Sequence, residues 1–396
     1  MERLEGSRSR YRWIMLTLAF FAAFTLHVMV FSYSPVIPWV ISEMGVTYAQ
    51  AGFVFSTLVL TLSLSRIGWG LLFDHFQLKR VMGFAMVLIG FSSLLRSFVA
   101  NYVMLVLLQM VLGVALGSIL PCLPKLVAAW FPREEEGFAT GLYMTGTAIG
   151  DITGLALTPW LMAWTGSWRA TFIIYSVWAL LLATVWWIMA KQPSGEQLNK
   201  VRSEASMTKS LVNVLKMKEI WVLTGFFICA AVCYDMISLW LPNILQLKGM
   251  SPTMVGLFIS LLPLGSLMSG PIVGGLSDRF GRRRLIMIGL GAASGLMILL
   301  IMSSTDIVLY AAIFLVGFCP NGVLTLTLAI PAGFKDRTLT ASAVGLMSSI
   351  GNVGSIVMPV VIGYIKDVTG SFMLGLALLA LMAEGMLVLG LLNRNL

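Results

Sequence analysis

The side chains that could do chemistry are a few ionisable groups inside long apolar runs of the chain. If those runs cross a membrane, each such group costs several kcal/mol, so each is a candidate for function. Arg66 is the sharpest candidate, because a guanidinium binds a planar carboxylate or an oxyanion through two parallel hydrogen bonds. Its alternative role is structural, as a partner of Asp74 or as a cap on backbone carbonyls.

Two acids complement this arginine. Asp151 could titrate and carry a proton, or it could pair with Arg66, and Asp235 is a second acid of the same kind. Protonation of either acid would free Arg66 for an anion, which gives a symport cycle. Each acid also has a structural interpretation: helix-packing hydrogen bonds for Asp151, and a structural or external-gate role for Asp235.

Four further residues are weaker candidates for contact with a substrate. His27 is one, because histidine titrates near neutral pH, although a single histidine on an apolar face is more often structural. Lys125 is another, unless its long side chain extends to the cytoplasmic side. Tyr143 and Asn352 could add an aromatic wall and a hydrogen-bonding amide.

The sequence holds little material for an enzyme. It has two histidines, His27 and His75, and no Ser/His/Asp, Cys/His or metal-ligand cluster is visible. Cys229 and Cys233 are four residues apart, but no histidine or acid shares their turn, so they are expected to pack as small apolar residues. We therefore expect no enzyme, no cofactor and no metal.

Composition then identifies the elements that must position these side chains. The 396 residues are 58% hydrophobic and 11% charged, whereas a soluble domain is about a quarter charged. About 20 apolar residues cross a bilayer as a helix, and continuous runs indicate helices and not a barrel. We predict twelve spans, at residues 13–40, 49–73, 81–100, 102–130, 138–163, 168–190, 219–246, 252–276, 282–303, 306–331, 339–364 and 370–392.

The net charge of +9 reports topology and not a nucleic-acid partner. With these spans, 20 of the 26 Lys and Arg lie on one side of the membrane. The opposite side holds four, which are Arg96, Arg169, Lys248 and Lys366. Because basic residues concentrate on the cytoplasmic side, both termini are predicted to be cytoplasmic.

The two halves of the chain repeat each other. Gly274 to Arg284 is a basic turn between two spans, and Gly70 to Arg80 is a weaker copy in which Asp74 precedes Asp278 by 204 positions. Three further pairs keep this offset: Pro38 with Pro242, Gly45 with Gly249, and Gly52 with Gly256. Such a period indicates an internal duplication.

A turn of the form G-x-x-x-D-R-x-G-R-R between two spans, present in both halves, resembles the signature of the major facilitator superfamily. The resemblance implies two six-helix bundles, here 1–190 and 219–396, joined by a cytoplasmic linker at 191–218, with the site near mid-membrane between them. It also implies that the basic turns act as a cytoplasmic gate. The gating residues are Asp74, Lys79, Arg80, Asp278, Arg279, Arg282 and Arg283.

Residues 66–74 further resemble the nitrate/nitrite porter branch, in which an arginine at this spacing binds the anion. Gly351-Asn352-Val353-Gly354 resembles a glycine–asparagine signature of that branch, and Gly150-Asp151 looks like its repeat copy. The second arginine of the branch is replaced by Gly270, so the two-arginine clamp of that branch is absent. Where many proton-coupled members of the superfamily keep an arginine, this chain has Gln109.

These features predict a secondary transporter of a small anion, a carboxylate or an inorganic oxyanion, in the cytoplasmic (inner) membrane. Coupling would be to protons or to a counter-anion, and we expect a monomer surrounded by lipid. The main alternative is a carrier of a cationic or neutral amphiphile, with Asp151 and Asp235 as its acidic contacts. A ligand sensor that does not transport is a remote alternative.

Overall fold

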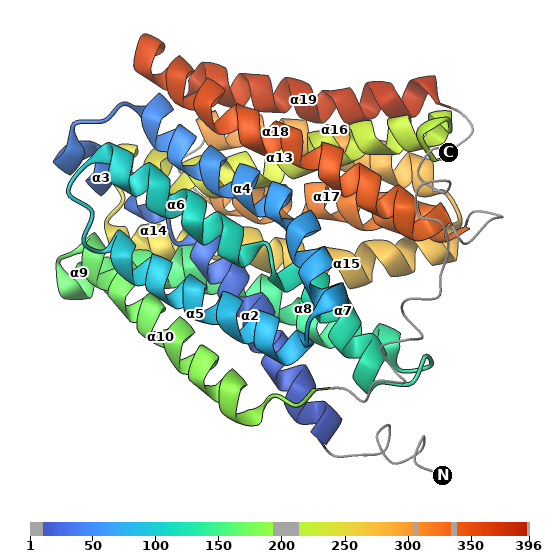
Figure 1. Cartoon of the computed structure of the whole chain (residues 1–396). Helices are drawn as coiled ribbons and strands as arrows, with labels where there is room; N and C mark the ends of the chain where they lie inside the picture. The colour runs from blue at the N-terminus through green and yellow to red at the C-terminus, as the bar shows by residue number, and fades with distance from the viewer. Residues whose placement is uncertain (1–10, 193–213, 304–306, 334–338, 394–396) are drawn as a thin grey trace. The chain divides into compact units, whose positions relative to one another are not determined.

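The computed structural model describes residues 11–192, 214–303, 307–333 and 339–393, and every regular element in these ranges is helical (Figure 1). The elements are α2 (Tyr11–Phe31), η2 (Ser34–Val36), α3 (Ile37–Met44), α4 (Tyr48–His75), α5 (Leu78–Arg96), α6 (Tyr102–Leu116), α7 (Ile119–Trp130), α8 (Glu136–Ile152), η3 (Thr153–Leu157), α9 (Thr158–Thr165), α10 (Trp168–Met189), α13 (Lys218–Leu247), α14 (Pro252–Ile259), α15 (Leu261–Phe280), α16 (Arg283–Ser303), α17 (Ile307–Ala329), η4 (Ile330–Gly333), α18 (Leu339–Thr369) and α19 (Met373–Leu392).

Within the described ranges, eleven helical stretches are long and apolar enough to cross a membrane. The expected span at 138–163 is not in this set. It consists of α8, the π-helical turn η3 and α9, and its polar and glycine residues, Asp151 among them, lower its hydropathy. Helix continues without a gap from Glu136 to Thr165, which accounts for the twelfth predicted span.

Contacts divide the chain into two compact units. Unit 1 consists of Met1–Trp39 and Thr57–Glu204, and unit 2 consists of Val40–Ser56 and Ala205–Leu396. The end of α3 and the start of α4 therefore belong to unit 2. Most of the predicted linker, and several of the basic residues counted for topology, lie outside the described residues.

Glycines let the helices of unit 1 approach closely, as small residues do at helix interfaces in lipid. Along α8, a Cβ at Gly146 or Gly150 would lie 2.5 Å from a backbone carbonyl oxygen of α2. Gly154 continues this contact, whereas a Cβ at Gly141 would meet nothing within 4 Å. Three of the four glycines that recur at a spacing near four in 141–154 therefore lie against α2.

Glycines also allow close contacts between helices of unit 2. A Cβ at Gly317 of α17 would lie 1.8 Å from the carbonyl oxygen of Leu262 in α15. On α18, Gly351 and Gly354 face side chains of α13. Backbone groups satisfied within helices and close glycine contacts are what a helical bundle in lipid requires.

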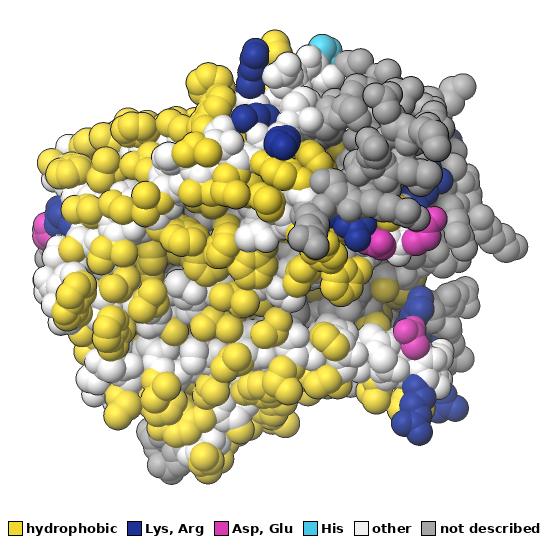
Figure 2. All heavy atoms as spheres, turned by 90° about the horizontal axis from the view of Figure 1, so that it is seen from below, with side chains coloured by type: hydrophobic (Ala, Val, Ile, Leu, Met, Phe, Trp, Pro, Cys, Tyr) yellow, Lys and Arg dark blue, Asp and Glu magenta, His cyan; other side chains and the backbone are white. Residues whose placement is uncertain are grey.

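The molecular surface is rich in large apolar side chains. Figure 2 shows one face on which hydrophobic side chains predominate and charged side chains gather toward the margins. Ile67, Ile188 and Ile307 are each about three quarters exposed. Exposed apolar surface of this extent marks contact with a membrane.

Candidate functional site

Arg66 lies in the middle of the span formed by α4 and is half-buried. Its helix is fastened to α6 on both sides of it, because Ser65 Oγ and Trp69 Nε1 both donate to the carbonyl oxygen of Val114, at 3.1 and 2.6 Å. The Arg66 Nε is buried without a hydrogen-bond partner, and among the described residues no ion pair involves this side chain. The guanidinium is therefore positioned but not neutralised by an acid.

The structure brings His27 and Asp151 together. His27 Nδ1 of α2 and Asp151 Oδ1 of α8 are 2.6 Å apart, and the two side chains are 28% and 8% exposed. The glycine contacts between α2 and α8 place them there, since Gly150 immediately precedes Asp151. Sequence reasoning considered these residues separately and allowed an Arg66–Asp151 pair, which the described structure does not form.

Lys125 pairs with Asp74 of the first basic turn. Its Nζ lies 2.6 Å from Asp74 Oδ1 and 3.3 Å from the carbonyl oxygen of Gly70. The suggested Arg66–Asp74 pair is thus replaced by a Lys125–Asp74 pair. Nearby, the carbonyl of Lys79 accepts from Trp186 Nε1, and Arg80 is exposed.

In unit 2, Asp235 of α13 accepts a hydrogen bond from Ser355 Oγ of α18 at 2.6 Å. Asn352 lies one turn before Ser355 and is half-buried. At the basic turn, Asp278 Oδ1 is 3.8 Å from Arg283, and both side chains are exposed. Arg279 lies over the ring of Phe280, and Arg282 is exposed.

Sequence reasoning missed Arg96, which it counted among the external charges. This side chain is fully buried at the end of α5. It donates to Gln109 Oε1 at 3.0 Å and to Ser93 Oγ at 3.2 Å, and its guanidinium lies 4.3 Å from the ring centroid of Phe172. Gln109 stands where many members of the superfamily have an arginine, and here it is contacted by an arginine of the neighbouring helix α5. The sequence signal for this buried arginine was Ser93, which lies three residues before Arg96 on the same helical face.

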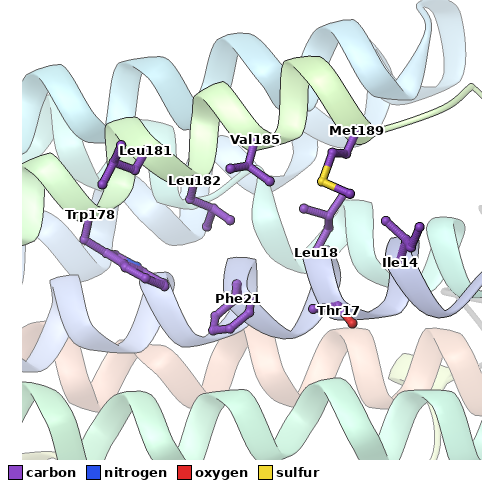
Figure 3. Close-up of a pocket in the computed structure, with 9 residues that line it drawn as sticks. All are labelled: Ile14, Thr17, Leu18, Phe21, Trp178, Leu181, Leu182, Val185 and Met189. Atoms are coloured by element: carbon purple, nitrogen blue, oxygen red, sulfur yellow. The ribbon is translucent and has the colours of Figure 1, made fainter.

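Two features of unit 1 lie apart from these charges. Tyr143 is 2% exposed and belongs to the hydrophobic core. An apolar groove of about 300 Å³ lies between α2 and α10. Figure 3 shows its lining residues, among them Phe21, Trp178 and Leu182. The groove has no charged lining residue, so it is not the site of an anion.

No group of three or more His, Cys, Asp or Glu side chains in the described ranges could hold a metal ion. Among the buried and half-buried charges named above, the guanidinium of Arg66 has the chemistry to hold a planar anion through two hydrogen bonds.

Comparison with known proteins gives the family context. Residues 19–251 and 243–395 match the model of the Major Facilitator Superfamily. The probable sulfoacetate transporter SauU of Cupriavidus necator is 26% identical over 387 residues, covering 90% of this chain and 87% of that protein. The gallate transporter of Pseudomonas putida is 25% identical over 384 residues, covering 87% and 84%. A solved bacterial homolog of the human lysosomal transporter Spinster superimposes with a TM-score of 0.78, over 97% of this chain and 95% of that chain, at 14% identity.

Proposed function

This chain belongs to the Major Facilitator Superfamily, and on that premise we propose that it transports a small organic anion carrying a carboxylate or a related oxyanion. Two relatives are named for sulfoacetate and for gallate, both of which carry a carboxylate. Membership in a family of transporters also identifies the chain as a transporter and not an enzyme.

The observation that carries the proposal is the state of Arg66. A cation in the middle of a span is costly unless it is compensated, and no acid of the described chain compensates it. A planar anion that accepts two hydrogen bonds from the guanidinium would provide the compensation. Trp69 and Ser65 hold the helix at this point, so the guanidinium is pre-positioned for the anion.

Coupling to protons is the second part of the proposal, and the His27–Asp151 pair supports it. Asp151 pairs with His27, and the two side chains come from different helices. When protonated, the pair carries one more positive charge than when deprotonated. A proton taken up here offsets the negative charge of a bound anion, which links uptake of the anion to the proton gradient.

The remaining parts follow from the family and from the charge distribution. We place the protein in the cytoplasmic membrane with both termini inside, and its bundles at 1–190 and 219–396 with the linker 191–218 between them. The monomer is the proposed working form. The gating roles of the two basic turns belong to the same proposal.

The test of the substrate class is thermal unfolding of the purified protein with panels of small carboxylates, oxyanions and amines. A ligand that binds the folded state raises the midpoint. We expect carboxylates to raise it, Arg66→Lys to abolish the shift, and the control Arg133→Lys, an exposed position, to keep it. An unchanged shift in Arg66→Lys removes this residue from the site, and a shift with amines alone favours the amphiphile carrier.

The test of coupling is Asp151→Asn in proteoliposomes. Because this variant cannot release the proton, it should exchange internal for external anion and yet fail to accumulate anion when a pH gradient is imposed. Retained pH-driven accumulation would exclude Asp151 as the proton carrier.

A further inference from the structure

We propose that Asp367 is a gating residue on the external side, where its carboxylate clasps the start of α4 to the end of α18. The proposal rests on the proposed function in one respect, because it assumes transport by alternating access. The clasp consists of Asp367 with the backbone N–H groups of Tyr48 and Ala49. It lies wholly within unit 2, and none of the gating residues predicted from the sequence is part of it.

The contact is a two-pronged cap on a helix N-terminus. Tyr48 N donates to Asp367 Oδ1 at 2.9 Å, and Ala49 N donates to Asp367 Oδ2 at 2.8 Å. The first N–H groups of a helix have no partner within the helix, and a carboxylate is favoured beside them. Both oxygens of Asp367 are thus engaged by a segment more than 300 positions earlier in the chain.

The two helices beneath the clasp touch through their backbones. A Cβ at Gly363 would lie 2.4 Å from the carbonyl oxygen of Tyr48, and a Cβ at Gly52 would lie 2.3 Å from that of Pro359. The ring of Tyr48 also packs against Phe372, with centroids 5.5 Å apart. The start of α4 is therefore seated on α18 over more than one helical turn.

The rest of α4 is fastened elsewhere. From Thr57 onward this helix belongs to unit 1, where Gly113 of α6 packs against it so closely that a Cβ would lie 2.5 Å from the carbonyl oxygen of Leu58. One continuous helix of 28 residues thus has its two ends held by different compact units. In the proposed division into bundles at 1–190 and 219–396, α4 belongs to the first bundle and α18 to the second. Rocking of one bundle against the other therefore opens the seat of α4 on α18.

The placement and strength of the clasp suit a gate. At 1.5 Å per residue, α4 is about 42 Å long, so its start lies across the membrane from the basic turn that follows His75. Asp367 is exposed, and water can take over its hydrogen bonds when the clasp opens. Loss of a helix cap shifts an equilibrium about fivefold to tenfold, enough to bias a gate without locking it.

The experiment measures access to the buried seat. Ala51, fully buried in the first turn of α4, is replaced by cysteine in the full chain, and its labelling by a membrane-impermeant maleimide is followed in proteoliposomes. The parent without this cysteine gives the background from the native thiols. We expect Asp367→Ala to raise the labelling rate about fivefold to tenfold, and Asp367→Glu to restore much of the protection.

A second variant opens the seat without touching the carboxylate. Gly363→Ala inserts a methyl group against Tyr48, whereas Gly345→Ala on the same helix is a matched control with nothing within 4 Å. Faster labelling in Gly363→Ala but not in Gly345→Ala supports the gate. Unchanged labelling in both Asp367→Ala and Gly363→Ala, with or without a lower unfolding midpoint, reduces Asp367 to a structural cap and overturns the proposal.

Binding of carboxylates in the thermal assay is measured on the same variants. If labelling responds to Asp367→Ala while no anion binds any variant, the clasp stands and the proposed substrate class fails. If anions bind and labelling does not respond, the substrate class stands and the clasp fails.

Discussion

Replacing Gly150 by alanine tests whether helix packing sets the geometry of the His27–Asp151 pair. The new Cβ would lie 2.5 Å from the carbonyl oxygen of Phe24 and 2.9 Å from the Cβ of His27. Ordinary contact begins near 3.4 Å, so α2 and α8 must separate by about 0.9 Å, the difference between 3.4 and 2.5 Å. Neither obstacle is the free end of a flexible side chain, so the helices themselves must move.

The displacement acts directly on the pair. Moving His27 Nδ1 and Asp151 Oδ1 from 2.6 Å to about 3.5 Å takes them beyond hydrogen-bonding range. Overpacking costs about 1–3 kcal/mol, and alanine regains about 1 kcal/mol of helix propensity over glycine. Gly141→Ala on the same helix gains the propensity and meets nothing within 4 Å. The two variants should therefore differ in stability by about 1–3 kcal/mol.

The assay has two parts, unfolding midpoints of the purified variants in one detergent and pH-driven accumulation in proteoliposomes. We expect Gly150→Ala to unfold at a lower temperature than Gly141→Ala and to lose accumulation while keeping exchange. Equal midpoints, or normal accumulation by a destabilised Gly150→Ala, would refute the link between helix separation and the proton-carrying pair.

Two other predictions concern the remaining buried charges. Lys125→Gln should leave the anion affinity within about twofold. It should lower the free energy of unfolding by less than about 1 kcal/mol, because its partner Asp74 is 47% exposed. A large loss of affinity in the thermal assay would place Lys125 in the substrate site. Arg96→Lys should be less stable than Arg96→Met, since lysine keeps a buried charge but cannot reproduce the forked bonds to Gln109 and Ser93. Equal or reversed unfolding midpoints would show that the charge of Arg96 is solvated by other means.

The fold was largely predictable because its signals are local. Apolar runs of spanning length and a repeat of 204 positions are read along the chain, and the major facilitator fold that they indicate is confirmed. The glycine spacing near four in α8 and η3 is a local signal of the same kind, because three of these glycines lie against α2. The π-helical turn within the fifth span was missed, since no residue pattern in 153–157 announced it.

Pairing between helices was less predictable. His27 lies 124 positions from Asp151, and Lys125 lies 51 positions from Asp74. Hydropathy places each residue at a depth, but the rotation of a helix about its axis decides which side chain faces which neighbour. Arg96 illustrates this, because its position near the end of α5 suggested exposure, and its orientation buries it completely.

The internal repeat preserves a contact between helices but not the polar residues beside it. A Cβ at Gly150 would meet Phe24, and a Cβ at Gly354 would meet Ile228, so both members of this contact recur at the offset of 204. By the same offset Asp151 corresponds to Ser355, and not to Asn352 as the glycine–asparagine pattern suggested.

Ser355 also takes part in a buried polar contact, but there the carboxylate belongs to the opposite helix, as Asp235 of α13. Both units thus place an acid where the corresponding helices cross, α2 with α8 and α13 with α18, and only unit 1 adds a histidine there. The steric fit of the crossing is common to the two halves, whereas the histidine–aspartate pair occurs in the first. A functional role transferred from one half to the other by sequence offset alone would therefore assign the acid to the wrong helix.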